Sequence, residues 1–519
     1  MHPSSSPRAR MGAAIVALIA LGTAIGHGQL NPSPVAKAMI RETALPPIDR
    51  GLRDQDPPRA ARTGDDANRV HSSQGDTLPY VRGSIIVKFK DDATRGAMTA
   101  ATAQVAGTIA DRSSWADFDI VDIPADVDAE AAAAAMRARP DVEYAQPRYR
   151  NHAMARPNDT LYGNQWNFPA IDMERAWDIQ PGASAEIIVA VLDSGMAFQS
   201  GSVRYISRFP FRVTPNGPLY PALGQVDVPF AAAPELGASG STRFASPRDF
   251  IWNDDLPVDL DGHGTHVAGT IGQLTNNGNG TAGMAYNVRL MPVKVIQGTW
   301  DDIFGSPFVG TDDVVARGVR YAADNGAKVI NLSIGREEGG PAPVVTDAIR
   351  YAVDRGVFVA VASGNTRADG NQPNRLAQPA PDIAGMVAVG AVGRTLDIAF
   401  YSTTGPYVEL AAPGGDQRQG GVSAGILQQT LDLDMLETYT RPPRADSFAF
   451  EYFQGTSMAT PHVSGFAALL MQQGITNPAA IEAAMKQFST DRGATGRDDL
   501  YGFGLINPRA TLRGLGLAR

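Results

Sequence analysis

Residues Ile187–Leu192 read IIVAVL, an unbroken apolar run that ends directly before Asp193. A strand that is covered on both faces shows such a run, because neither face needs polar side chains. Similar runs recur later in the chain, at 288–296, 328–333, 357–362 and 386–392. Helical patterns lie between and after them, at 264–274, 311–325, 344–355, 457–473 and 478–487. This alternation predicts an α/β fold with a doubly wound, mostly parallel sheet and flanking helices.

The composition narrows the function classes. The chain has 519 residues, 43% of them hydrophobic, and no cysteine. Disulfide scaffolds, thiol nucleophiles and cysteine-based zinc sites are therefore excluded. Residues 157–519 carry 26 Lys and Arg against 36 Asp and Glu. Because binding to phosphates needs a basic face, this acidic part argues against nucleic acid as a partner.

The first 150 residues divide into three predicted parts. Residues 1–28 resemble an export signal, since Arg8 and Arg10 precede a short apolar run at 11–25. A membrane anchor is the alternative, but about 20 apolar residues are needed to span a bilayer. We therefore expect an exported protein, periplasmic or extracellular, without a stable membrane anchor. Residues 29–77 lack a sustained apolar period and predict a disordered linker.

Residues 78–150 predict a small α+β domain. Strand patterns occur at 83–90, 118–123 and 142–146, and helical patterns at 92–105 and 129–138. Their order is β-α-β-α-β, for which we expect an antiparallel sheet. The following domain, 157–519, carries the α/β pattern described above.

Three segments of that domain concentrate reactive side chains. Asp193 ends the apolar run, His263 lies in DGHGTHVAG (261–269), and Ser457 lies in GTSMATPHVSG (455–465). Such positions, at the end of a strand or the start of a helix, are where α/β sheets hold their ligands. Each residue alone has an ordinary explanation, as a turn aspartate, a capping or core histidine, or a helix N-cap serine. Pro461 is expected in the first turn of its helix, where its missing N–H is tolerated.

Together the three segments favour a nucleophilic triad. All three histidines beyond residue 156, at 263, 266 and 462, lie in these motifs. Histidine can accept and return a proton near neutral pH. The chain order Asp, His, Ser matches one of the known triad arrangements.

The motifs resemble those of the subtilisin family of serine peptidases. The matching pieces are LDSG at 192–195, DGHGTHVAGTI at 261–271, NLSIG at 331–335, VASGN at 361–365 and GTSMATPHVSG at 455–465. The resemblance extends from about Asn164 to Asn507. It implies an exported serine endopeptidase that cleaves peptide bonds through an acyl-enzyme.

The resemblance also implies a role for each matching residue. Ser457 is expected as the nucleophile, His263 as the base and Asp193 as the group that orients the imidazole. Asn365 and the backbone N–H of Ser457 are expected to form the oxyanion hole. Two further segments are expected to bind substrate: Ser333, Ile334 and Gly335 as an edge strand, and Ala362, Ser363 and Gly364 as a pocket wall.

The small domain at 78–150 resembles the family's propeptide, which assists folding and inhibits the enzyme. Its removal is expected between about Arg150 and Asn158. The expected partners are polypeptide substrates and this propeptide, and the enzyme is expected to act as a monomer. Two long insertions depart from the family pattern, at 196–258 and 416–454. Loops of this length are usually functional or disordered.

No cofactor is expected for catalysis, but the resemblance suggests structural calcium. The segment LTNNGNG at 274–280 occupies the position of the family's calcium loop, with Leu274, Asn276, Asn277 and Gly280 as candidate positions. It looks one residue too long, and the first insertion hides any acidic partner.

Two other functions remain as alternatives. A metallo-hydrolase could use His263 and His266, although their spacing is i, i+3 without the glutamate of the H-E-x-x-H pattern. A catalytically inert binding protein could use the same fold, but none of the expected catalytic residues is missing.

Overall fold

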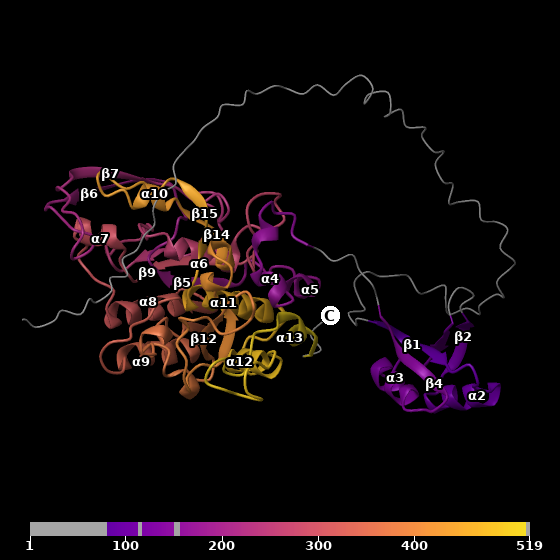
Figure 1. Ribbon diagram of the computed structural model, residues 1–519. Coiled ribbons are helices and arrows are strands. Elements are labelled where there is room, and N and C mark those ends of the chain that lie inside the picture. Colours follow the sequence, from indigo (N-terminus) through magenta and orange to yellow (C-terminus); the bar gives the residue numbers. More distant parts are fainter. Residues whose placement is uncertain (1–79, 113–116, 150–155, 515–519) are drawn as a thin grey trace, which may run out of the picture. The chain divides into compact units, whose positions relative to one another are not determined.

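The computed structural model describes residues 80–112, 117–149 and 156–514. The predicted signal peptide and linker lie outside these residues, as do residues 150–155 of the expected cleavage region. In the described part, no helix has the length and apolar character needed to cross a membrane. The N-terminal module and the main domain are described separately below (Figure 1).

The N-terminal module is a four-stranded antiparallel sheet with two helices. Its elements are β1 (Tyr80–Phe89), α2 (Arg95–Gln104), β2 (Thr108–Arg112), β3 (Asp119–Asp122), α3 (Ala129–Arg137) and β4 (Val142–Tyr149). The strand order is β2-β3-β1-β4. Ile85, Val121 and Met136 lie in a hydrophobic core of its own. The predicted α+β architecture is confirmed, but β2 was not predicted, because all five of its residues are exposed and show no apolar alternation.

The main domain is built on a seven-stranded sheet with the order β13-β12-β11-β10-β5-β9-β8. All neighbouring strands run parallel. The strands are β5 (Ile188–Asp193), β8 (Arg248–Asp249), β9 (Arg289–Lys294), β10 (Val329–Leu332), β11 (Phe358–Ala362), β12 (Met386–Val392) and β13 (Leu410–Pro413). Every residue of β5 and of β10 to β13 is buried. The predicted doubly wound parallel sheet is therefore confirmed.

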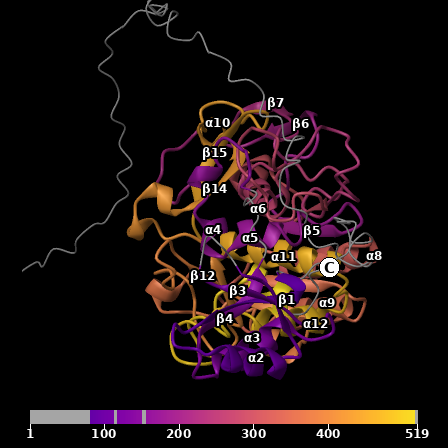
Figure 2. The same cartoon turned by 90° about the vertical axis from the view of Figure 1, so that its right-hand side faces the viewer.

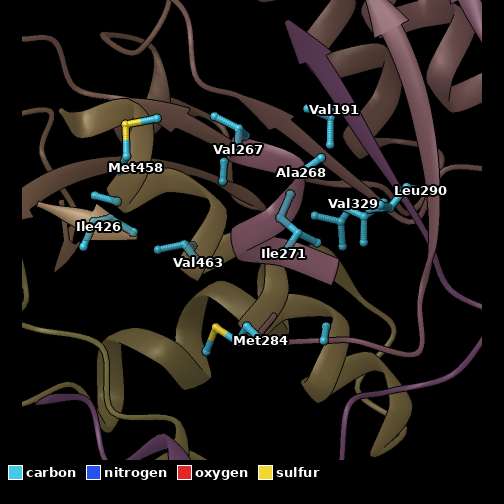
Figure 3. Close-up of a cluster of buried hydrophobic side chains, with 14 of the residues drawn as sticks. Val191, Val267, Ala268, Ile271, Met284, Leu290, Val329, Ile426, Met458 and Val463 are labelled. Atoms are coloured by element: carbon cyan, nitrogen blue, oxygen red, sulfur yellow. The ribbon is translucent and has the colours of Figure 1, made fainter. Parts of the chain in front are cut away.

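Helices cover both faces of this sheet (Figure 1). Alternate residues of β5 show this division, because Val189 and Val191 pack in one core cluster and Ala190 and Leu192 in another. The first cluster includes side chains from α6 (His263–Gly272) and α11 (Thr456–Gln472). Figure 3 shows Val267 and Ile271 of α6 in this cluster with Val463 of α11. The second cluster includes α8 (Asp312–Asp324) and α9 (Pro343–Val353).

The two insertions form ordered structure rather than loose loops. The first contains the antiparallel pair β6 (Gly201–Ser207) and β7 (Gly224–Phe230), and the second contains α10 (Leu433–Leu436) and the antiparallel pair β14 (Ile426–Leu431) and β15 (Phe448–Phe453). In both Figure 1 and Figure 2, α10, β14 and β15 lie near β6 and β7. Ala445 joins the insertions by donating to Pro229 O over 2.9 Å and accepting from Ala231 N over 3.0 Å.

The edge strand β8 comes from the first insertion, and a buried ion pair binds the segment that follows β8 in this insertion. Lys294 and Asp301 are both fully buried, with Nζ and Oδ2 2.8 Å apart. Lys294 also donates to Val258 O over 2.8 Å, and Trp252 Nε1 donates to Asp301 Oδ1 over 2.6 Å. Because Lys294 lies opposite Asp193 on the neighbouring strand, the first insertion is anchored beside the end of β5. The remaining helices are α4 (Asn167–Ala170), α5 (Met173–Trp177), α7 (Thr299–Phe304), α12 (Pro478–Gln487) and α13 (Pro508–Gly514).

Candidate active site

The predicted reactive residues lie where the central strands end and two helices begin. Asp193 is the last residue of β5, and His263 is the first residue of α6. Ser457 is the second residue of α11, and Asn365 follows the end of β11 by three residues. β5, β10 and β11 are adjacent in the sheet, so their carboxyl ends share one edge.

Asp193 and His263 are joined by a short hydrogen bond. His263 Nδ1 lies 2.7 Å from Asp193 Oδ1, which also accepts from Ser194 N over 2.8 Å. The Asp193 side chain is fully buried, whereas 27% of the His263 side chain is exposed. Burial disfavours imidazolium, but the charge of Asp193 and its hydrogen bond outweigh burial and raise the pKa of His263 to about 9.

A buried aspartate, Asp259, shapes the turn that leads into α6. Its Oδ1 accepts from the backbone N–H groups of Asp261 and Gly262 over 3.0 and 2.8 Å. Its Oδ2 accepts from both N and Oγ1 of Thr265, over 3.0 and 2.6 Å. Ser194, which directly follows β5, donates to Asp259 Oδ1 over 3.0 Å and so connects this carboxylate to the end of that strand. We did not predict this role for Asp259; its only sequence signal is its position four residues before His263.

Ser457 and Ser333 form two reciprocal hydrogen bonds. Ser457 Oγ donates to Ser333 O over 3.0 Å, and Ser333 Oγ donates to Ser457 O over 2.7 Å. The Ser457 hydroxyl is thus directed to a carbonyl rather than to the His263 imidazole. Catalytic hydrogen bonds are often formed only once substrate is bound.

The position expected for Pro461 was wrong. It is the sixth residue of α11 and lies in the second turn rather than the first. At that place a proline removes an i to i−4 hydrogen bond, and residue i−4 is Ser457. The carbonyl that Pro461 leaves without a backbone donor is the one that accepts from Ser333 Oγ.

Asn365 is oriented by the residue that precedes Ser457. Its Oδ1 accepts from Thr456 N over 2.9 Å and from Thr456 Oγ1 over 3.0 Å. These two bonds identify the amide oxygen, so Nδ2 is the group left to donate elsewhere. The amide is exposed, next to the start of α11. A helix N-terminus and a free amide N–H both favour a developing negative charge.

The sequence model of the subtilase family, peptidase S8, matches residues 184–504. The chain belongs to the subtilase family. A second model, the fervidolysin N-terminal prodomain, matches residues 66–148. The protein is therefore a subtilisin-like serine endopeptidase that carries an N-terminal prodomain.

Individual relatives support the assignment. The thermophilic serine proteinase of Bacillus sp. (strain AK1) is 32% identical over 427 residues, which cover 82% of this chain and 86% of that protein. Thermitase of Thermoactinomyces vulgaris is 31% identical over 341 residues, covering 66% of this chain and 94% of thermitase. The crystal structure of fervidolysin from Fervidobacterium pennivorans shares the fold, with a TM-score of 0.51 and 23% identity over 84% of this chain and 61% of that one.

In this subtilase the two predicted substrate-binding segments are joined by one side chain. Asn374 Nδ2 donates to Ile334 O over 3.1 Å and to Ala362 O over 2.7 Å. Gly335 packs so closely on Asn374 that an added Cβ would lie 2.2 Å from its Nδ2. Residues 333–335 follow β10 but belong to no strand here. No sequence motif pointed to Asn374.

Ser363 and Gly364, also in the predicted pocket wall, differ in their surroundings. The Ser363 side chain is fully buried and donates to Thr403 O over 3.0 Å. Gly364 has a φ of +110°, a conformation that side chains rarely adopt, and its N–H donates to Thr456 Oγ1 over 3.2 Å. The wall is therefore tied through Thr456 to the start of α11.

The two other histidines of the motifs are buried and neutral. Burial lowers the pKa of His266 to about 3 and that of His462 to about 4. His266 Nε2 bonds backbone carbonyls of β14 and β15, and His462 bonds Met458 O and Asn167. The described residues contain no group of three or more His, Cys, Asp or Glu that could hold a metal ion. These contacts give no support to a metal site at His263 and His266.

The candidate calcium loop follows α6 and meets two acidic residues that we did not predict. Asp159 Oδ2 accepts from Asn276 N over 2.9 Å, and Glu235 Oε2 accepts from Asn277 Nδ2 over 3.2 Å. Leu274 N donates to Glu235 O over 2.7 Å. Gly280 O accepts from Leu161 N over 2.7 Å, so all four candidate positions lie in this contact region. Both carboxylates are buried, and burial raises the pKa of Glu235.

Proposed function

We propose that Asp193, His263 and Ser457 form the catalytic triad of this endopeptidase. The observation that carries the proposal is the 2.7 Å contact between His263 Nδ1 and Asp193 Oδ1. That bond directs the other ring nitrogen, Nε2, to the role of base. Ser457 stands at the start of α11, where free N–H groups and the helix dipole favour negative charge.

In the proposed reaction Ser457 Oγ leaves the Ser333 carbonyl, transfers its proton to His263 Nε2 and attacks the scissile carbonyl carbon. The resulting oxyanion is stabilised by Asn365 Nδ2 and by the Ser457 N–H. The imidazolium, stabilised by Asp193, then protonates the leaving amine as the C–N bond breaks. Water hydrolyses the acyl-enzyme by the same steps, with His263 again acting as the base.

Substrate binding is proposed on the two segments that Asn374 joins. Residues Ser333, Ile334 and Gly335 would pair with the substrate backbone as an added strand. Ala362, Ser363 and Gly364 would form a wall of the pocket for the residue before the cleaved bond. The support for this placement is that Ser333 bonds Ser457 directly, while Gly364 bonds the neighbouring Thr456.

We propose that the enzyme is exported and matures by cleavage between about Arg150 and Asn158. The support is the apolar N-terminal segment and the prodomain match at residues 66–148. One of the relatives is the extracellular protease of Xanthomonas campestris, which is 30% identical over 404 residues covering 74% of this chain and 61% of that protein.

We further propose structural calcium at the loop 274–280. Asp159 and Glu235 are buried, and the charge of Asp159 is one of the causes that raise the pKa of Glu235. Their contacts with the loop are neutral N–H groups. Burying carboxylates without a positive partner is costly. Carboxylate, amide and backbone oxygens are the ligands that Ca²⁺ prefers, so the donor set fits this ion.

The triad is tested by expressing the full chain with Ser457→Ala. The parent should release the prodomain by itself, whereas the variant should remain a precursor that contains residues 80–149. Ser423→Ala is the matched control, because Ser423 is an exposed serine of the second insertion. Mass spectrometry of the purified chains gives the answer. Self-processing of the Ser457→Ala chain at the parental rate would contradict the triad assignment.

A further inference from the structure

His266 connects the helix of His263 to the hairpin that leads to Ser457. It lies on α6 one turn after His263, and its side chain is fully buried. Its Nε2 lies 3.0 Å from Ile426 O on β14 and 3.1 Å from Glu451 O on β15. Since carbonyl oxygens only accept, Nε2 must carry the proton and donate to both strands. One imidazole therefore bridges α6 and both strands of the hairpin.

Stacking fixes the plane of this imidazole. The His266 ring lies parallel to the Phe453 ring, with centroids 4.3 Å apart and an interplanar angle of 9°. Phe453 is the last residue of β15, four residues before Ser457. The His266 ring therefore contacts the segment that leads into α11 and Ser457. Because burial lowers the pKa of His266 to about 3, the ring is neutral near neutral pH.

A second contact joins the hairpin to the residue before His263. Thr430 Oγ1 donates to Gly262 O. Gly262 is the N-cap of α6 and has a φ of +96°. An added Cβ there would lie 3.1 Å from Thr430 Oγ1. The first turn of α6 is thus held at two points along β14, through Gly262 near its end and through His266 at its start.

No direct hydrogen bond holds the base and the nucleophile together in the described structure, because the Ser457 hydroxyl donates to Ser333 O. The separation of His263 and Ser457 must therefore be set by the elements that carry them. The two helices pack together in the first core cluster, and the hairpin in addition contacts the start of α6 and runs into α11. Its two strands pair from Ile426 and Phe453 to Leu431 and Phe448.

We propose that His266 is a positioning residue for catalysis which, together with Thr430, holds the His263 helix at the working distance from Ser457 through the β14–β15 hairpin. This inference rests on the proposed triad. It assigns no chemical step to His266, whose Nε2 donates to the two strands.

The test compares His266→Phe with His266→Gln in the full chain. Phenylalanine keeps a ring against Phe453 but removes the donor, whereas glutamine can place an amide N–H near the position of Nε2. We expect kcat to fall by about 100-fold in His266→Phe, since a displacement of about 1 Å can cost that much. KM should stay near the parental value, and His266→Gln should recover at least about tenfold of the lost kcat. Active-site titration normalises the rates for the fraction of reactive enzyme.

Trp177→Phe is the control variant: it should destabilise the fold without moving the helix that carries His263. Trp177 Nε1 donates to Met284 O over 2.8 Å, so this variant also leaves a buried carbonyl unpaired while keeping an aromatic ring. It should lower the melting temperature and leave kcat within about threefold of the parent. If His266→Phe fails to mature, Thr430→Val replaces it, because valine keeps the shape and removes only the bond to Gly262 O. We expect it to lower kcat by roughly tenfold with KM unchanged.

Three results would overturn the proposal: parental kcat in His266→Phe or in its replacement Thr430→Val, no recovery in His266→Gln, or an equal loss of kcat in Trp177→Phe. Failure of the triad itself is recognised separately, because only then does Ser457→Ala process its own prodomain.

Discussion

Ser333 and Ser457 exchange two hydrogen bonds, each hydroxyl donating to the other residue's backbone carbonyl, over 3.0 and 2.7 Å. The second bond exists because Pro461 supplies no N–H to the Ser457 carbonyl. At the Ser457 carbonyl, a side chain that follows β10 therefore takes the place of the missing helical hydrogen bond. These bonds link the proposed nucleophile to a proposed substrate-binding residue.

We predict that Ser333→Ala and Pro461→Ala are energetically coupled. Ser333→Ala should lower the free energy of unfolding by about 1–3 kcal/mol, because the partly buried Ser457 carbonyl loses its donor. With Pro461→Ala also present, residue 461 has an N–H that can donate to the Ser457 carbonyl. Ser333→Ala should then lower the free energy of unfolding by less. All four proteins carry Ser457→Ala to prevent autolysis: this background alone, each single variant and the double variant. Their free energies of unfolding are measured with a denaturant. If the effects of the two substitutions on the free energy of unfolding add to within about 0.5 kcal/mol, then Ser333 Oγ and the N–H of residue 461 do not compete for the Ser457 carbonyl.

The pH dependence should follow the Asp193 and His263 pair. A base must be neutral, and Asp193 raises the pKa of His263 to about 9. We therefore predict that kcat/KM of the free enzyme rises about tenfold per pH unit below that pKa and levels off above it. A raised folded-state pKa also means that this pair stabilises the fold below pH 6.5 and that the contribution is lost as the pH rises through about 9.

Asp193→Asn tests the cause of that profile. Without the carboxylate charge, the midpoint of kcat/KM should move to lower pH, and kcat should fall by about 10⁴-fold, as known for triads in which this residue is replaced. Asp261→Asn is a useful comparison, because Asp261 acts on the His263 pKa by charge without bonding its ring. It should shift the midpoint less and largely preserve kcat. An unchanged midpoint in Asp193→Asn would refute the assignment of the profile to this pair.

Asn365 should act mainly on the transition state. We predict that Asn365→Ala lowers kcat by roughly 10²–10³-fold with little change in KM; this magnitude is that reported for the corresponding donor of a subtilisin. Thr456→Val removes the hydroxyl that bonds Asn365 Oδ1 and should cause a smaller loss, because the bond from Thr456 N to Oδ1 remains. Steady-state kinetics on a peptide substrate separates the two effects. A rise in KM as large as the fall in kcat would instead assign Asn365 to substrate binding.

Local sequence was sufficient for most of the central strands. β5 and β10 to β12 are buried on both faces, so their apolar runs were visible without any knowledge of their neighbours. β13 was missed because its four residues, LAAP, are too short and contain a proline. β6 and β15 were missed because neither shows a buried apolar run.

Features that depend on distant contacts could not be predicted. Asp259 is recognisable as a structural residue only once its carboxylate is seen between Ser194 and Thr265. Asn374 acts through two carbonyls that lie 40 and 12 residues away in the chain. The second-turn position of Pro461 matters through tertiary structure, because it leaves the Ser457 carbonyl to accept from Ser333 Oγ. In each case a buried polar group found its partner through tertiary packing.

Removal of calcium should destabilise the enzyme through Glu235 and Asp159. These residues lie 76 positions apart in the chain, yet both contact the loop 274–280. We predict that a chelator lowers the melting temperature of the inhibited mature enzyme and that added calcium restores it, with about 2.7 kcal/mol of stabilisation at 100 times the dissociation constant. Glu235→Gln should lower the melting temperature in calcium and make it insensitive to the chelator, because it removes one of the two buried charges. Glu437→Gln, an exposed acidic residue of the second insertion, should respond like the parent. An identical melting temperature of the parent with and without chelator would exclude calcium from this loop.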